Sequence, residues 1–505
     1  MGMRDHLPEV KPADPLYRDL QMRGNNRRFV GAPDSVFMVA DTRQVVAAVD
    51  AAVSSGKKLA VRSGGHCIEG FVDDPAVECV IDLARMDSVY FDPGRRAFAV
   101  EAGVTFGRLY QALDMGWGVT LPGSICPSVG VGGHVIGGGF GALSRLHGCI
   151  SDHLYAVESV VVDANGKAKQ VIATRDEDEP NRDLWWAHTG GGGGNFGVAT
   201  KFWFRSRDAH GDDPALLLPR RPSGFTVASV AWKWADLDEA TFTTLLHNFM
   251  GWCERNSSPD TPAAAVWGQL IAFRKEFGVV MLVGQIDPGR PASRETLDAY
   301  FAEVSANVPN GTKTTRDSEP WLYNTINLPD ASDALGLPAT QLRSKAKGAY
   351  LRSPLDTAQT ATVYERLTDE DYGWRGGIMS LATWGGKINA LNPRDTAIAE
   401  RESTMLLGVG SFWDKPEENE KHLGWTRTFY RDLFASTGGV PVPNGQTGGC
   451  YINWPDPDLL DQEWNKSGSP WSDLYYGGNY TKLREAKSRW DPRRIFSHPL
   501  SIEPG

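Results

Sequence analysis

Two glycine-rich segments each contain a side chain that could act as a nucleophile toward a bound ligand. His66 ends the run Arg62-Ser63-Gly64-Gly65-His66, and Cys126 lies within residues 121–149, nine of which are glycine. Glycine at this density lets backbone N–H groups approach a large polar ligand closely. An imidazole or a thiol held in such a loop could therefore bond to a cofactor. The alternative is a pair of glycine-rich surface loops in which both side chains are structural.

The residues around His66 predict a site for a pyrophosphate-containing ligand. Ser63, Gly64 and Gly65 follow a predicted strand and offer backbone donors, and Arg62 could supply a counter-charge. This spacing is not GxGxxG before a helix, so a Rossmann-type site is not indicated. A third glycine cluster follows at 190–197. Three clusters in one part of the chain suggest a single long ligand that all three contact.

Hydrophobic periodicity places the first of these loops at the end of a strand. Segments 36–40 and 59–61 are predicted strands on either side of a helix that begins after Asp41, its N-cap. Residues 14–35 are polar and are expected to form a loop. Further strands are predicted at 80–83, 97–100, 119–121, 156–162 and 168–172, and Thr105 is expected to cap a helix before Cys126.

The sequence changes character after residue 207. Between 208 and 445 the glycine clusters stop and alternating apolar segments predict an antiparallel sheet with amphipathic helices. The predicted strands lie at 227–234, 266–273, 279–286, 376–381 and 403–411, and the helices at 238–255 and 293–305. Residues 446–505 are aromatic and turn-rich, include a predicted strand at 450–454, and are expected to return to the first domain, 1–207.

Length and composition limit the classes of function. A chain of 505 residues is expected to form two domains. A net charge of −10 with no basic tract argues against nucleic-acid binding. No segment has the apolar character of a signal peptide or a membrane helix. The six cysteines are widely spaced and match neither a disulfide framework nor a metal site, so we expect a cytoplasmic protein without metal.

Taken together, these motifs resemble those of the berberine bridge enzyme-like flavoprotein oxidases. The matching segments are Arg-Ser-Gly-Gly-His at 62–66, Cys-Pro-Ser-Val-Gly-Val-Gly-Gly-His at 126–134, the glycine run with Asn-Phe-Gly at 190–197, Tyr-Tyr-Gly-Gly-Asn-Tyr at 475–480 and Asp-Pro-x-x-x-Phe at 491–496. They occur in the family's order over nearly the whole chain. The sequence is most similar to the bacterial antibiotic-tailoring members of the family.

The resemblance implies an α+β fold of the vanillyl-alcohol-oxidase (PCMH) type. An FAD-binding domain would combine 1–207 with the C-terminal segment, and an α+β substrate-binding domain with an antiparallel sheet would span 208–445. FAD would be attached through its 8α-methyl group to His66 and through C6 to Cys126. Two covalent bonds raise the potential of the ring, which favours hydride acceptance, and hold it without a tightly closed pocket.

The resemblance also implies which residues contact FAD besides these two attachment points. They are Arg62, Ser63, Gly64, Gly65, Ser124, Ile125, Val129, Gly132, Gly133, His134, Gly137, Gly138, Val198, Asn479 and Tyr480.

The catalytic base departs from the family pattern. The C-terminal strand of the family reads Tyr-x-Asn-Tyr, and the second tyrosine takes the proton of the substrate hydroxyl. Here the segment is Tyr451-Ile452-Asn453-Trp454, and an indole N–H can only donate. A further tyrosine often follows the Gly-Gly-Gly run, where this chain has Phe140.

Several residues could replace the missing phenol. Tyr451 is nearest, but it would need a bulge, because residues 451 and 454 point to opposite faces of a regular strand. Tyr476, Tyr480 or an acid from the middle of the chain are further candidates. Alternatively, a hemiacetal substrate would need no strong base, and Trp454 would then form an aromatic wall.

The predicted function is a bicovalent FAD oxidase that takes a hydride from an alcohol or hemiacetal of a bulky natural product or sugar. O₂ would be reduced to H₂O₂, and the protein would be a monomer or homodimer whose partners are its small-molecule substrate and O₂. The alternatives are a flavin-dependent oxidative cyclase or dehydrogenase with a non-tyrosine base, and a flavin-binding protein without catalysis.

Overall fold

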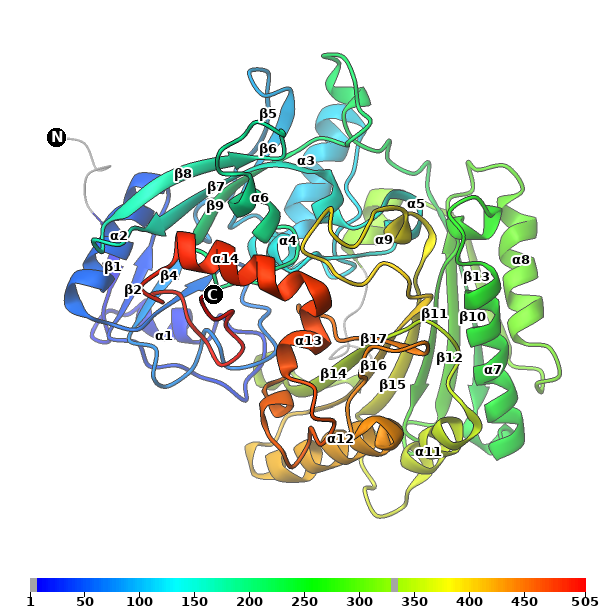
Figure 1. The fold of residues 1–505 in the computed structure, drawn as a ribbon. Coiled ribbons are helices and arrows are strands. Elements are labelled where there is room, and N and C mark those ends of the chain that lie inside the picture. Colours follow the sequence, from blue (N-terminus) through cyan, green and yellow to red (C-terminus); the bar gives the residue numbers. More distant parts are fainter. Residues whose placement is uncertain (1–6, 328–334) are drawn as a thin grey trace.

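The computed structural model describes residues 7–327 and 335–505. These residues form three sheets with the strand orders β1-β2-β4-β3, β5-β6-β9-β7-β8 and β13-β10-β12-β11-β15-β16-β14-β17 (Figure 1). The first sheet mixes parallel and antiparallel pairs, and the other two are antiparallel. The predicted α+β class is therefore confirmed.

The first sheet contains the β-α-β unit that the sequence predicts. Its strands are β1 (Glu9–Val10), β2 (Ser35–Met38), β3 (Leu59–Arg62) and β4 (Cys79–Asp82), and α2 (Thr42–Ser55) connects β2 to β3. The Asp41 carboxylate caps α2 by accepting a hydrogen bond from the Gln44 backbone N–H, 3.0 Å away. One prediction here was wrong. Residues 14–35 include a short helix, α1 (Tyr17–Gln21), because Tyr17 and Leu20 are buried against apolar side chains of the sheet.

The second sheet lies beside the first and shares its core. Its strands are β5 (Val89–Asp92), β6 (Ala97–Glu101), β7 (Leu154–Val162), β8 (Ala168–Thr174) and β9 (Val198–Phe204), accompanied by α3 (Phe106–Trp117) and α6 (Arg182–Ala187). The predicted strand at 119–121 is reduced to a single bridge between Val119 and Arg220. Thr105 is the N-cap residue of α3, as predicted.

The glycine-rich stretch 121–149 contains two short helices, α4 (Val131–Ile136) and α5 (Ser144–His147). It lies directly against the loop that carries His66. A Cβ at Gly64 would overlap the backbone nitrogen of Gly130, and a Cβ at Gly130 would overlap that of Gly64. The two loops that bear His66 and Cys126 therefore meet backbone to backbone, which only glycine permits.

The eight-stranded sheet is covered by helices on one face. Its strands are β10 (Phe225–Lys233), β11 (Trp267–Phe273), β12 (Val279–Ile286), β13 (Thr312–Glu319), β14 (Arg343–Leu351), β15 (Gly377–Thr383), β16 (Met405–Trp413) and β17 (Thr447–Gly449). The covering helices are α7 (Glu239–Arg255), α8 (Ser293–Val304), α11 (Thr357–Thr368) and α12 (Asn419–Leu433), while the short α9 (Trp321–Ile326) contacts α3 (Figure 1).

The opposite face of this sheet is only half-buried. Its side chains alternate with those that pack under the helices, and its partly exposed residues include Val227, Ser229, Ala231, Gln269, Ile271, Met281, Val283, Ile378 and Ser380. All nine are uncharged, and six of them are apolar. This face is available to a large, mainly apolar molecule.

The C-terminal segment returns to the N-terminal part through α13 (Trp471–Tyr476) and α14 (Tyr480–Trp490), drawn in red in Figure 1. The Tyr476 hydroxyl donates to the Gly191 carbonyl at 2.9 Å, and the Lys487 ammonium donates to the Asn195 carbonyl at 2.6 Å. These contacts fasten the tail to the third glycine cluster.

The predicted strand at 450–454 is wrong. The strand is β17, which ends at Gly449, a residue with a φ of +89°. The Cys450 N–H then bonds to the Leu474 carbonyl of α13 at 2.6 Å, so it makes no ladder contact with β14. Residues 451–454 form a turn in which the Trp454 N–H donates to the Tyr451 carbonyl at 2.9 Å.

Among the described residues, none of the helices has the length and apolar character that crossing a membrane requires.

Candidate active site

His66 and Cys126 share one hydrogen-bonding partner, Ser128. The Ser128 Oγ lies 2.9 Å from His66 Nε2 and 3.3 Å from Cys126 Sγ. His66 and Cys126 are half-buried, and Ser128 is exposed. Two potential nucleophiles that are 60 residues apart in sequence thus lie on the same patch of surface, joined by a single hydroxyl.

The Cys126 loop is held by α3 and by its own serine. The Cys126 backbone N–H donates to Ser124 Oγ at 3.1 Å, and the Tyr110 hydroxyl donates to the Ser124 carbonyl at 2.7 Å. The Gly107 N–H donates to the Pro127 carbonyl at 2.8 Å. On the other loop, the Ser63 hydroxyl donates to the Ala102 carbonyl at 2.5 Å. Both loops are therefore fixed by hydrogen bonds to neighbouring backbone.

Arg62 is not the free counter-charge that the sequence suggested. Its side chain is 3% exposed, and its Nε donates to Asp82 at 2.8 Å. Arg23 also pairs with Asp82, and Asp73 lies 3.5 Å from Arg62 Nη1. The register of the parallel strands puts Arg62 opposite Asp82, so carboxylates of the protein already neutralise it.

The glycines of the three clusters fall into two groups. Gly133 and Gly193 are exposed, and nothing lies within 4 Å of the position that a Cβ would take. By contrast, a Cβ at Gly137 would overlap the Asn453 amide and one at Gly138 would overlap Ile398. Gly132 packs against Ala102 and Ser63, and Gly65 against the Arg23 carbonyl. Only the first group leaves backbone open to a ligand.

His134 is half-buried, and its buried Nε2 has no hydrogen-bonding partner among the described residues. Its ring meets the Phe106 ring edge-on at 4.7 Å between centroids. Burial lowers the pKa of His134 to about 3, so the imidazole is neutral at physiological pH. Its backbone carbonyl accepts a hydrogen bond from the Asn453 amide at 3.0 Å, which ties α4 to the C-terminal turn.

Five other predicted contacts lie in varied surroundings. Val129 packs at the edge of the first core, Val198 is buried in β9, and Ile125 is exposed. The Asn479 amide donates to the Pro393 carbonyl at 2.7 Å and so anchors a loop that precedes β16. The Tyr480 ring stacks on that of Tyr476 at 5.9 Å.

An aromatic cluster lies where the half-buried sheet face meets the C-terminal turn. Phe140 contacts Trp384 and Tyr451 edge-on, with ring centroids 4.8 and 5.4 Å apart. Tyr350 of β14 lies 5.3 Å from Trp384 and 6.1 Å from Tyr451. Trp454 completes the cluster, with its ring 5.7 Å from that of Tyr451.

Trp454 rests on the sheet because two glycines make room for it. A Cβ at Gly348 would overlap Trp454 Cε3, and one at Gly408 would lie 3.3 Å from Cζ3. Gly348 pairs with Gly408 across the strands, and Gly408 pairs with Ser380 of the half-exposed face. Trp454 therefore ends a row of residues on that face.

Tyr451 is a buried phenol with two hydrogen-bond donors near its oxygen. The Asn453 side-chain amide donates to its hydroxyl at 3.0 Å, and the Phe140 backbone N–H also approaches it. Burial raises the pKa of Tyr451 well above its usual value, and these two donors lower it in part. The turn brings Tyr451 and Trp454 together without the bulge that a strand would have required.

Sequence reasoning missed Tyr350 and misplaced Tyr476. Tyr350 lies on the same face of β14 as Gly348, and an alternation pattern through residues 343–351 would have been the signal. Tyr476 lies among Trp471, Tyr475 and Tyr480, and its hydroxyl is bonded to the Gly191 carbonyl. It is not in ring contact with the cluster around Tyr451.

A buried ion pair supports the cluster from behind. Arg401 donates to both oxygens of Asp152, at 2.7 and 3.1 Å, and to the Ile388 carbonyl at 2.8 Å. Asp152 also accepts from the Cys149 N–H at 2.8 Å. Because Cys149 and Ile388 belong to the same small core as Tyr451, this pair fixes the floor of the cluster.

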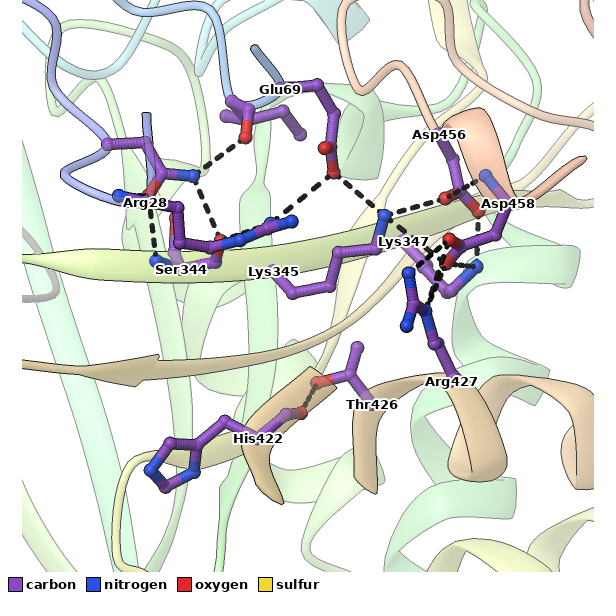
Figure 2. A network of polar contacts seen from close by, with 12 residues as sticks. Arg28, Glu69, Ser344, Lys345, Lys347, His422, Thr426, Arg427, Asp456 and Asp458 are labelled. Atoms are coloured by element: carbon purple, nitrogen blue, oxygen red, sulfur yellow. Dashed lines mark hydrogen bonds and ion pairs between the residues drawn. The ribbon is translucent and has the colours of Figure 1, made fainter. Parts of the chain in front are cut away.

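Figure 2 shows a second buried network, between the His66 loop and the C-terminal turn. Lys345 Nζ lies 2.8 Å from both Glu69 and Asp456, and Lys347 Nζ lies 2.5 Å from Asp456. The network also includes Arg28, Arg427 and Asp458. Burial alone would lower the pKa of Lys345, but Asp456 and Glu69 raise it above its usual value. Glu69 is three residues from His66, and Asp456 is two residues from Trp454. The network therefore holds the His66 loop in a fixed position relative to the C-terminal turn.

Comparisons with known proteins agree with this arrangement. Residues 33–171 match the family model described as an FAD binding domain, and residues 450–503 match the one described as berberine and berberine like. Aclacinomycin-N/aclacinomycin-A oxidase of Streptomyces galilaeus is 48% identical over 100% of this chain and 91% of its own length. Hexose oxidase of Chondrus crispus is 28% identical over 95% of this chain and 92% of its own.

Solved structures give the same result. The crystal structure of aclacinomycin oxidoreductase is 46% identical, with a TM-score of 0.94 over 99% of this chain and 100% of that one. A glycopeptide hexose oxidase complexed with teicoplanin is 44% identical, with a TM-score of 0.95 over 99% of each chain.

The predicted fold, the FAD cofactor and the oxidoreductase class are thereby confirmed. The chain belongs to the berberine bridge enzyme-like family of FAD-linked oxidoreductases.

Proposed function

We propose that this enzyme is a bicovalent FAD oxidase that oxidises an alcohol or hemiacetal carbon of a bulky natural product or sugar and forms H₂O₂ from O₂. FAD would be attached through its 8α-methyl group to His66 and through C6 to Cys126. The observation that carries the proposal is the approach of both side chains to one oxygen, that of Ser128, at 2.9 and 3.3 Å.

The residues at this position fit such a flavin. C6 and the carbon that bears the 8α-methyl group lie in the same six-membered ring, so attachment at both positions would require two nucleophiles close together. His66 and Cys126 meet this requirement and are half-exposed. Gly133 and Gly193 lie in two of the predicted FAD loops and leave their backbone open to a ligand. When bound, FAD supplies the hydride acceptor.

Tyr451 is the proposed base. Tyr451 would act as the phenolate, which takes the proton of the substrate hydroxyl as the hydride leaves carbon and becomes the phenol, and the Asn453 amide at 3.0 Å would stabilise the phenolate form. Phe140, Trp384 and Trp454 surround the phenol with apolar rings, which exclude water and strengthen that hydrogen bond. The proposed base is thus the single tyrosine of the Tyr-x-Asn-Trp segment, which corresponds to the first tyrosine of the family pattern Tyr-x-Asn-Tyr.

The substrate is proposed to lie along the half-buried face of the eight-stranded sheet. The row Met281, Ile271, Ser380, Gly408 and Gly348 runs across four strand pairings to Trp454. An uncharged, largely apolar row suits a large neutral ring system that presents a sugar or alcohol to Tyr451. The relatives named above act on aclacinomycins and on hexoses, which is consistent with this substrate class.

The three predicted segments have corresponding roles in this proposal. Residues 1–207 and 446–505 would enclose FAD, and 208–445 would form the substrate wall. The tail also contributes β17 to the edge of the eight-stranded sheet, next to β14. Through it, the same tail would contact both FAD and substrate.

A second candidate is an oxidative cyclase or a dehydrogenase that uses the same flavin. Its motivation is that Phe140 and Trp454 stand where the family pattern has phenols, which leaves fewer groups to move a proton. Peroxide release decides between oxidase and dehydrogenase: one H₂O₂ for each oxidised substrate supports the oxidase, and turnover without peroxide supports the dehydrogenase.

Acid precipitation of the purified protein tests the flavin attachment. A yellow pellet with a colourless supernatant is expected, because covalent FAD stays with the polypeptide. The variants His66→Ala and Cys126→Ala should each keep one attachment, and the double variant should release FAD. A yellow supernatant from the wild-type protein would overturn the covalent assignment while leaving the FAD family assignment intact.

A further inference from the structure

Ser128 connects the two residues that the proposed function makes the flavin attachment points. Its hydroxyl is both a donor and an acceptor, and it lies at hydrogen-bonding distance from His66 Nε2 and from Cys126 Sγ. A chain of hydrogen bonds can therefore run from the Cys126 S–H through the Ser128 O–H to the imidazole nitrogen.

A cysteine attacks as the thiolate, so its proton must leave before sulfur can bond to carbon. An imidazole joined to the thiol by one hydroxyl offers an acceptor for that proton.

We propose that Ser128 relays the proton of the Cys126 thiol to His66 and thereby drives formation of the second flavin attachment. This inference rests on the proposed bicovalent flavin. Ser128 accepts the thiol proton as it passes its own proton to His66 Nε2. The new carbon–sulfur bond at C6 replaces a carbon–hydrogen bond, whose proton is lost, and O₂ takes up the two electrons and both protons to give H₂O₂.

The surroundings of Ser128 fit a relay rather than a structural serine. Its hydroxyl makes its two described hydrogen bonds with His66 and Cys126, and its side chain is exposed, so it supports no buried packing. The neighbouring serine has a different task, since Ser124 Oγ accepts from the Cys126 backbone N–H at 3.1 Å. Ser124 therefore holds the loop in shape, whereas Ser128 contacts the two reactive side chains.

The test compares two matched pairs of variants. Ser128→Thr keeps the hydroxyl and Ser128→Val has nearly the same shape without it, while wild type and Ser128→Ala form the second pair. Ser54→Ala, at an exposed position in α2, serves as the unrelated control. Each holoprotein is digested, and mass spectrometry measures the fraction of His66 and of Cys126 peptides that carry flavin.

Wild type and Ser128→Thr should carry flavin at both positions. Ser128→Ala and Ser128→Val should keep the His66 attachment and form the Cys126 attachment at least tenfold more slowly at pH 7. Incubation in air at pH 9 should restore the Cys126 attachment in both variants, because hydroxide can then remove the proton without the relay. His66→Ala should show the same slow step at pH 7 and the same recovery at pH 9.

Equal attachment at Cys126 in wild type, Ser128→Ala and Ser128→Val would overturn the relay. Loss of both attachments without recovery at pH 9 would also overturn it, because that result would mean that Ser128 only shapes the loop. If Ser128→Ala does not fold, the Thr and Val pair and the pH dependence of His66→Ala still decide the outcome. Absence of a Cys126 attachment in wild type would instead contradict the proposed function itself.

Discussion

Tyr451 and Trp454 lie three residues apart, and their rings meet edge-on with centroids 5.7 Å apart. A regular strand would have placed them on opposite faces. The turn that joins them forms because the Cys450 N–H bonds to Leu474 of α13. One aromatic cluster therefore holds both the proposed base and the proposed wall of the substrate site.

Replacing the proposed base should slow oxidation without affecting the cofactor. We expect Tyr451→Phe to lower kcat by about 10² to 10⁴-fold, the usual contribution of a general base, with both flavin attachments intact. Stopped-flow reduction of the flavin under anaerobic conditions measures this step directly. Tyr90→Phe, at an exposed position in β5, is the control and should stay near the wild-type rate. A Tyr451→Phe enzyme that reduces its flavin within threefold of wild type would rule out the phenol as base.

Adding a methyl group at Gly348, which lies against the Trp454 ring, should disturb the proposed substrate site. In Gly348→Ala the new methyl group would overlap Trp454 Cε3, so the indole must move. We expect KM to rise at least fivefold and tryptophan fluorescence to shift. Gly116→Ala is the matched control, because nothing lies within 4 Å of its Cβ position in α3, and it should stabilise the helix by about 0.5 to 1 kcal/mol. Unchanged KM in Gly348→Ala would show that Trp454 does not contact substrate.

Breaking the buried network should lower the stability of the protein, because the network joins the His66 loop to the C-terminal turn. Lys345→Met leaves Glu69 and Asp456 without the cation 2.8 Å from each, and removal of one partner from a buried pair costs about 3 to 5 kcal/mol. Urea denaturation should show this loss. Lys313→Met, whose ion pair is about half-exposed, should change stability by less than about 0.5 kcal/mol. Similar midpoints for the two variants would argue against the network as a structural link.

Buried histidines should make the protein less stable in mild acid. Burial lowers the pKa of His134 to about 3 and those of His188 and His422 to about 4. The unfolded chain binds these protons below its ordinary histidine pKa of about 6.5, whereas the folded chain does not. Their contribution is complete above pH 6.5 and falls as pH drops from there toward 4, by about 1.4 kcal/mol per pH unit for each proton.

Thermal melts between pH 7.5 and 4.5 check this expectation. His422→Gln should weaken the pH dependence by about one proton, after allowance for its own loss of stability. A melting temperature that is flat between pH 6.5 and 4.5 in the wild-type protein would contradict it.

Features that depend on neighbouring residues could be predicted from the sequence, whereas features that depend on contacts between distant segments could not. Asp41, Thr105 and the glycine clusters are short-range signals, and the β-α-β unit before His66 follows from them. The partner of Arg62 depends on the register of β3 with β4, which periodicity does not reveal. The turn at 451–454 depends on α13, which follows it by about twenty residues of sequence.

The residues that surround Tyr451 and Trp454 could not be predicted from the sequence for the same reason. Tyr350 lies near Tyr451 only because β14 pairs with β17 and β16 at one edge of the sheet. Gly348 and Gly408 make room for Trp454 only as a cross-strand pair. Alternation through 343–351 indicates that Tyr350 and Gly348 share a face, but the strand pairings that bring them to Tyr451 and Trp454 leave no signal in a single stretch of sequence.

Peptide mapping of the wild-type holoenzyme tests the central claim most directly. After digestion under denaturing conditions, mass spectrometry should find one FAD cross-linking the peptide that contains His66 to the peptide that contains Cys126. That result would follow from the approach of both side chains to Ser128. Recovery of both peptides without flavin, with free FAD in solution, would contradict it.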